Sequence, residues 1–186
     1  MLKHGKQLII EKNDFKFTKI DSTQFNLSFE ITNNNIFLPK IINFDLINLI
    51  FRLNPNIFAS IKHEFEEESV IISVLLKDIF CEIGLPQYYT DLHINMTNTL
   101  SGIRFFINNN KINANKPKVN DTECLPIEQI VIDFDVITMH YIKVNCDITL
   151  TDDHNLPQFT EKIIGNMIYN ILNKVKQFIE NITFNI

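Results

Sequence analysis

Two aspartates, Asp133 and Asp135, are the residues whose type and spacing best suit chemistry. Two residues apart on a strand, their side chains would project from one face about 7 Å apart. That separation lets two carboxylates share a divalent cation, as in metal-dependent phosphoryl-transfer enzymes. The competing interpretation is the wet face of a half-buried sheet, which the surrounding alternation of polar and apolar residues itself predicts. We favour the wet face, because Asp147 lies too far along the strand to supply a third carboxylate.

His140 and Cys146 share the apolar parity of the same stretch. Six residues of strand separate them by about 20 Å, which is too far for both to bind one ion. His63 could approach His140 across a sheet, but the sequence does not make them neighbours. We expect His140 to bond the backbone, in the core or at a bend. Nucleophile, zinc-protease and glycine-rich phosphate-loop motifs do not occur, and the chain has only 4 glycines. We therefore predict that the protein is not an enzyme, and that it has no catalytic residue, no metal and no cofactor.

The stretch that would carry these side chains, residues 130–150, alternates with period two throughout. Its even-numbered residues are mostly apolar and its odd-numbered residues include the charged ones, as in a strand with one buried face. A two-residue hairpin inside it would switch the inward set from even to odd, and no such switch occurs. We predict one strand, about 70 Å long if straight, that must curl or bulge to fit a domain of about 16 Å radius of gyration.

Other segments complete a sheet of about six to eight strands. Alternating phenylalanines predict two strands over residues 7–32, and residues 58–83 read as a hairpin with an acidic tip. Two more strands are expected around residues 92–96 and 103–107. Residues 40–53 have apolar side chains at helical spacing between Pro39 and Asn54-Pro55, which predicts a short helix.

The last element reads as a long amphipathic helix from about residue 157 to 182. Its apolar residues step by 4, 3, 4, 3 and 4, which predicts one buried stripe: Ile164, Ile168, Ile171, Val175, Phe178 and Ile182. Gly165 inside it costs about 1 kcal/mol relative to alanine. We expect that glycine to mark a close approach to a strand or another helix.

Bulk composition narrows the class of protein. The 186 residues predict a single domain over 1–186, with an exposed polar loop at 108–123. A net charge of −5 argues against nucleic acid as a partner, so we assign the 16 phenylalanines to the core. No apolar run reaches the roughly 18 residues of a transmembrane segment. Three cysteines without a CxxC pair, and no signal-peptide pattern, predict an intracellular, reducing compartment such as the cytoplasm or a viral particle assembled there.

Together these elements predict an α+β fold: a curved, mostly antiparallel sheet packed on a long C-terminal amphipathic helix, with a shorter helix near residues 40–53. In element order this outline resembles the helix-grip and tubular lipid-binding architectures. That resemblance implies an apolar pocket between the sheet and the final helix.

Two functions from different classes follow. We first expect a non-enzymatic assembly or adaptor protein with a protein partner or a homo-oligomer, because large Phe and Ile residues suffice to fill the interior. Its interface would use the 108–123 loop and Glu66, Glu67, Glu68, Tyr88 and Tyr89. The alternative is a carrier of a lipid or other apolar small molecule, lined by Phe134, Ile142, Ile164, Ile168, Ile171 and Val175. A metal-dependent hydrolase using Asp133 and Asp135 is a distant third.

Overall fold

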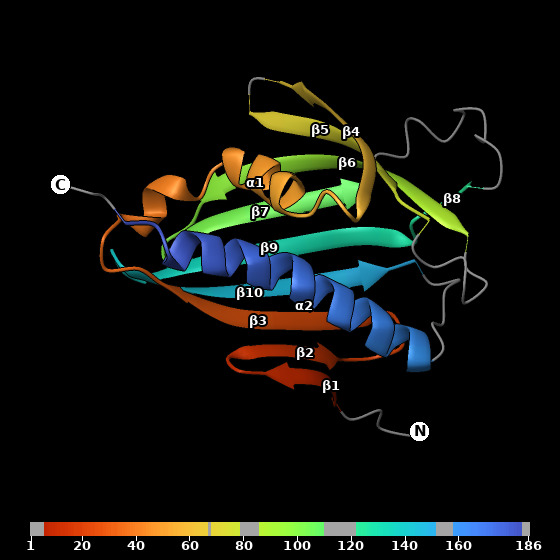
Figure 1. Ribbon diagram of the computed structural model, residues 1–186, viewed down its shortest axis with the longest axis horizontal. Helices are drawn as coiled ribbons and strands as arrows, with labels where there is room; N and C mark the ends of the chain where they lie inside the picture. The colour runs from red at the N-terminus through yellow and green to blue at the C-terminus, as the bar shows by residue number, and fades with distance from the viewer. Residues whose placement is uncertain (1–5, 67, 79–85, 110–121, 152–157, 184–186) are drawn as a thin grey trace.

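The computed structural model describes residues 6–66, 68–78, 86–109, 122–151 and 158–183 (Figure 1). Ten strands form one curved sheet in the order β1-β2-β3-β10-β9-β7-β6-β5-β4, with β8 paired to β6. This architecture confirms the predicted α+β class, with more strands than expected. The strands and helices are β1 (Gln7–Lys12), β2 (Phe15–Lys19), β3 (Gln24–Thr32), η1 (Leu38–Ile41), α1 (Asp45–Leu53), β4 (Phe58–Phe65), β5 (Ser69–Leu76), β6 (Gln87–Asn98), β7 (Gly102–Asn109), β8 (Thr122–Cys124), β9 (Ile127–Thr138), β10 (Tyr141–Leu150) and α2 (Gln158–Glu180).

The strand predicted over residues 130–150 is in fact two strands, so that prediction is wrong. The chain reverses after Thr138, and β9 and β10 form an antiparallel hairpin. Tyr141 pairs with Thr138, but Ile142 pairs with Val136, which leaves Ile137 out of the ladder as a β-bulge. The bulge adds one residue to β9 and so cancels the switch of phase that a two-residue turn would cause.

Even-numbered residues therefore point inward on both strands of this hairpin. Phe134, Ile142 and Val144 are 5%, 0% and 3% exposed and belong to the hydrophobic core. The inward face was thus predicted correctly, although the number of strands was not.

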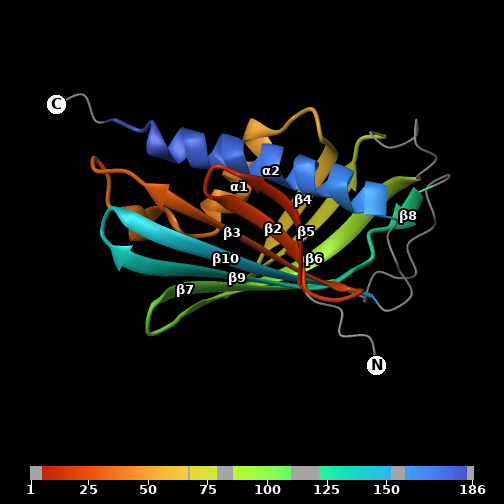
Figure 2. The same cartoon turned by 90° about the horizontal axis from the view of Figure 1, so that it is seen from below.

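Both helices lie on the concave side of the sheet (Figure 2). The helix expected near residues 40–53 is divided into η1 and α1, because Ile42 leaves helical geometry with ψ 88° and is buried. The Asn43 side chain then accepts a hydrogen bond from the Asp45 backbone N–H at 2.8 Å, close to the start of α1. Of the predicted loop at 108–123, residues 110–121 lie outside the described part of the chain; its ends belong to β7 and β8.

The long helix α2 packs on β1, β3 and α1. A Cβ on Gly165 would lie 2.8 Å from Cδ1 of Phe17 and 2.9 Å from Cδ1 of Ile10, so the predicted close approach is confirmed. The fully buried positions include Gly165, Val175 and Ile179, whereas Phe178 is 47% exposed, contrary to expectation. No described helix has both the length and the apolar character required to span a bilayer.

Candidate functional site

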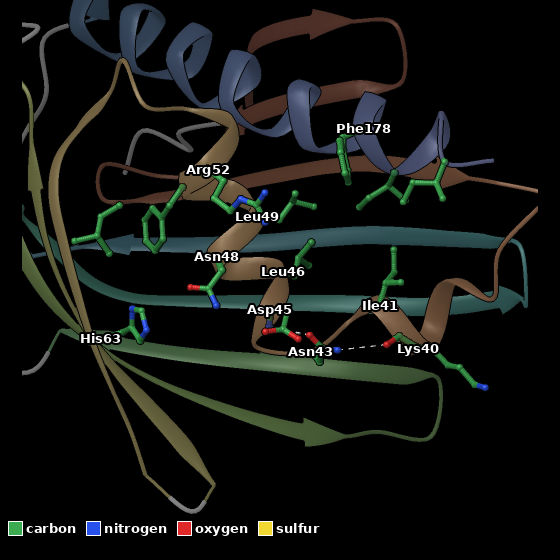
Figure 3. Close-up of a pocket in the computed structure, with 14 residues that line it drawn as sticks. Lys40, Ile41, Asn43, Asp45, Leu46, Asn48, Leu49, Arg52, His63 and Phe178 are labelled. Atoms are coloured by element: carbon green, nitrogen blue, oxygen red, sulfur yellow. Dashed lines mark hydrogen bonds between the residues drawn. The ribbon is translucent and has the colours of Figure 1, made fainter. Parts of the chain in front are cut away.

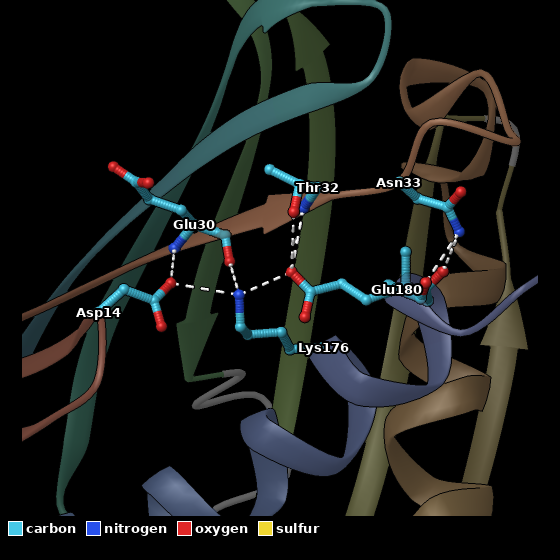
Figure 4. Close-up of polar contacts among 7 residues, drawn as sticks. Asp14, Glu30, Thr32, Asn33, Lys176 and Glu180 are labelled. Carbon is cyan, nitrogen blue, oxygen red and sulfur yellow. Dashed lines mark hydrogen bonds and ion pairs between the residues drawn. The ribbon is translucent and has the colours of Figure 1, made fainter.

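A polar network fastens the C-terminal half of α2 to the β1–β2 turn and to β3 (Figure 4). The Lys176 ammonium lies 3.2 Å from the Asp14 carboxylate and 2.7 Å from that of Glu180, and it also donates to the backbone carbonyl of Glu30. Asp14 in turn accepts a hydrogen bond from the Glu30 backbone N–H at 2.9 Å. The partly buried cation thus has three acceptors from three segments.

The end of α2 is capped by a side chain from far away in the sequence. Asn33 follows β3 and is 4% exposed. Its Nδ2 donates to the carbonyls of Ile179, Glu180 and Ile182 at 2.6, 3.3 and 3.0 Å. Ile179 and Glu180 lie in the last turn of α2, where carbonyls lack the usual donor four residues further on, and Ile182 lies just beyond the helix.

The Lys176 network makes stability depend on pH through Asp14. Burial raises the pKa of this carboxyl, but the Glu30 N–H and Lys176 outweigh burial and hold it below 3.8. A lowered pKa stabilises the fold above the unfolded-state pKa, and this contribution is lost as pH falls through the folded-state value. We expect Asp14→Asn to be less stable than wild type above about pH 5, and this difference to shrink as pH falls towards about 2. Urea unfolding across this range measures it; a pH-independent difference would contradict the assignment.

The N-terminal half of α2 is held on the same flank. Lys19 pairs with buried Glu161, and Lys12 donates to the Asn166 side chain at 2.9 Å. Lys12 also lies 4.7 Å from the centre of the Tyr169 ring. One flank of α2 is therefore tied to the β1–β3 side of the sheet along its length.

Apolar side chains lie between the sheet and the remaining surface of α2. We call this surface the inner face and define it by residues that pack on the hydrophobic core yet are only partly buried: Leu92, Ile130, Ile132, Ile148, Ile168 and Ile171. The register pairs Ile130 with Ile148 on β10 and with Ile107 on β7, so these strands present their apolar side chains to the concave side. Contact of this apolar surface with water costs about 25 cal/mol per Å².

A separate groove runs along α1 towards β4 and the end of α2 (Figure 3). It encloses about 780 Å³, which is within the range of small-molecule sites. Its apolar lining includes Leu46, Leu49 and Phe178, and its polar lining includes Lys40, Arg52 and His63. This groove is open and carries charge, whereas the inner face is apolar.

The residues predicted to line an apolar pocket are divided between two environments. Phe134, Ile142 and Val175 are buried in the core, whereas Ile168 and Ile171 belong to the inner face and Ile164 is partly buried. None of the six lines the groove. The groove residues carry no sequence motif, and only the packing of α1 beside β4 brings them together.

The residues predicted to form an interface lie at two places. Glu66 accepts a hydrogen bond from the Ser69 hydroxyl at 2.6 Å, Glu68 is exposed, and Glu67 lies outside the described residues. Tyr88 and Tyr89 are both partly buried in β6. Burial, and after it the nearby Glu123 carboxylate, raise the pKa of Tyr88.

The candidate metal ligands have protein partners on the convex face. Arg104 donates to both carboxylate oxygens of Asp133, at 2.6 and 2.9 Å, and the Ser101 hydroxyl donates to Asp135 at 2.6 Å. Within the described ranges, no three His, Cys, Asp or Glu residues are grouped so as to hold a metal ion. This arrangement favours the wet-face interpretation.

The remaining candidates are His140, which contacts backbone carbonyls, and Cys146, which is buried in the core. His140 lies in the β9–β10 turn, with Nδ1 2.9 Å from the Ile36 carbonyl and 3.1 Å from that of Asn33, which matches the predicted backbone bonding. Burial raises the pKa of the Cys146 thiol to about 12, so it stays protonated and is a poor nucleophile.

The sequence and the fold were each compared with those of known proteins. No protein-family profile matches the sequence, and no curated protein matches it. Many solved structures match its fold, and the following three are among them. A STAR-related lipid transfer protein fragment from Xanthomonas axonopodis has a TM-score of 0.67 at 9% identity, covering 94% of this chain and 98% of that one. The lipid transfer and protein localization domain of human StarD13 has a TM-score of 0.68 at 8% identity, covering 96% of this chain and 90% of that one. Human STARD10 has a TM-score of 0.70 at 9% identity, covering 93% of this chain and 72% of that one.

The chain has the fold of StAR-related lipid transfer domains. This finding overturns the prediction of an assembly or adaptor protein, since the shared fold extends over nearly the whole chain and belongs to proteins described by lipid transfer. The interior is also less completely filled than the prediction of an assembly protein requires. That prediction assumed an interior filled by its own Phe and Ile side chains, but Ile130, Ile132 and Ile148 remain partly exposed.

Proposed function

We propose that this protein carries a lipid or other apolar ligand between the curved sheet and α2, without a catalytic step. The observation that carries the proposal is the inner face, where apolar side chains of β6, β9, β10 and α2 remain partly exposed although they point towards the core. A bound apolar molecule would remove this surface from water and so stabilise the complex. The fold similarity to lipid transfer proteins supports the same function.

The charged flank of α2 fits this role. Lys19, Lys12 and Lys176 fasten the helix to the β1–β3 side, so a ligand need not hold α2 in place. The thiol groups of Cys124 and Cys146 are both free, which fits the expected reducing, intracellular compartment.

Native mass spectrometry of protein isolated from its own host without detergent tests the proposal. We expect a mass adduct of one lipid per chain, identified after organic extraction. Delipidated protein should then bind the uncharged fluorophore N-phenyl-1-naphthylamine with a saturable blue shift. Ligand-free protein from the host that also fails to bind the fluorophore would contradict the proposal.

A further inference from the structure

The chemistry of the inner face restricts the kind of ligand that it suits, and this inference rests on the proposed carrier function. Strand register identifies the paired inward residues of β5, β6, β7, β9 and β10, and none of these paired residues is charged. Glu128 has the same even parity on β9, but the register shift leaves it out of the ladder and it is exposed. An ionised group buried there would have no counter-charge, which is far more costly than burying a hydroxyl or carbonyl. Glu123 of β8, which shares the register of Tyr88, is exposed and negative, so it would further oppose an anion.

One inward side chain has a polar atom that no group in the described part of the chain satisfies. Thr90 lies on β6 and pairs with Val74 of β5. Its side chain points to the same inward side of the strand as those of Tyr88 and Leu92. It is 5% exposed, and its Oγ1 has no hydrogen-bond partner among the residues that the structure describes. Buried hydroxyls normally have a partner, because leaving one unpaired costs the full desolvation penalty.

Two other polar side chains bear on the inner face, and of the two only that of Asn109 has a hydrogen-bond partner within the described ranges. Asn109 of β7 also has inward parity, but its amide already donates to the Ile127 carbonyl at 3.2 Å. Thr160 of α2 is 1% exposed with an unpartnered Oγ1, and helical spacing puts it on the same side of α2 as Ile164 and Ile171. Both walls thus contribute an uncharged hydroxyl with unused hydrogen-bonding capacity.

We infer that the ligand is an uncharged lipid with a hydroxyl or carbonyl group, which hydrogen-bonds to Thr90 Oγ1 while its hydrocarbon covers the inner face. A threonine hydroxyl both donates and accepts, so it serves a ligand carbonyl or a ligand hydroxyl equally well. Lipids with a permanently charged headgroup are excluded from this site in their ionised form.

The test compares three probes with the same hydrocarbon chain: hexadecanol, hexadecane and hexadecyl sulfate. Each probe is titrated into delipidated protein that holds N-phenyl-1-naphthylamine, at concentrations below those at which the probe itself aggregates. The fall in fluorescence as the probe displaces the fluorophore gives the affinity of the probe. Wild type should bind hexadecyl sulfate at least about tenfold more weakly than hexadecanol. Thr90→Val, which removes only the hydroxyl, should weaken hexadecanol about fivefold and leave hexadecane within about twofold of wild type. Its melting temperature should not fall, because the variant removes an unsatisfied group.

Thr97→Val is the matched control, since Thr97 is an exposed residue on the same strand and should change none of the three affinities. Equal affinity for hexadecyl sulfate and hexadecanol would overturn the inference, as would equal weakening of hexadecanol and hexadecane by Thr90→Val. If the fluorophore and all three probes fail to bind wild type, the proposed carrier function itself fails.

Discussion

Replacing Ile130 with tryptophan is expected to weaken binding of N-phenyl-1-naphthylamine at least about tenfold, or about 1.4 kcal/mol. Ile130 is an inner-face residue of β9 with Ile148 and Ile107 as its cross-strand neighbours. It is partly exposed, so a larger side chain can extend into the space that a ligand would occupy. Fluorescence titration of delipidated protein measures the loss, and circular dichroism checks that the variant is folded.

Two matched variants locate the effect. Val131→Trp alters the next residue of the same strand, whose side chain has the opposite parity, and should leave binding within about twofold of wild type. Leu49→Trp adds the same bulk to the groove along α1. If Leu49→Trp abolishes binding while Ile130→Trp does not, the ligand lies in the groove and our assignment of the site is wrong.

Removing the Asn33 side chain is expected to lower the free energy of unfolding by about 2–3 kcal/mol. In Asn33→Ala, the carbonyls of Ile179, Glu180 and Ile182 lose their shared donor, and the Asn35 backbone N–H loses the acceptor that lies 2.7 Å away. A buried hydrogen-bond network is costly to leave incomplete, because the groups that lose their partner keep their desolvation penalty. Urea denaturation monitored by circular dichroism measures the change.

Asn34→Ala is the control for this prediction, because Asn34 is the exposed neighbour of Asn33. It should change stability by less than about 0.5 kcal/mol. Hydrogen exchange provides a second measurement: amides in the last two turns of α2 should exchange faster in Asn33→Ala than those near its start. Uniform acceleration along α2, or equal loss of stability in both variants, would contradict a capping role.

Alternation in the sequence was sufficient to predict which residues of β9 and β10 point inward, although it did not predict the turn between them. The reason is that side-chain parity depends on local strand geometry, while strand number depends on where the chain reverses. The bulge at Ile137 absorbed one residue and left the parity of Phe134 and Val144 unchanged. A pattern based on parity could not distinguish this hairpin from a continuous strand.

Helical periodicity likewise predicted α2 and the close approach at Gly165, but not which apolar residues would be covered. The neighbours of α2 decide its burial: Phe17 and Ile10 reach Gly165, while Phe178 borders an open groove. Periodicity defines a stripe only to within a fraction of a turn. The helix rests on β1, β3 and α1, so its buried line includes Ile179 and excludes Phe178.

By itself, the amino-acid sequence therefore determined the α+β class, the inward parity of the strands and the amphipathic C-terminal helix, because each depends on spacing between near neighbours in the chain. Tertiary structure alone decided how completely the inner face is covered, that Asn33 caps α2, and that Asp133 pairs with Arg104. These features join segments up to 149 residues apart, and the packing of a sheet against a helix is not encoded in any local pattern.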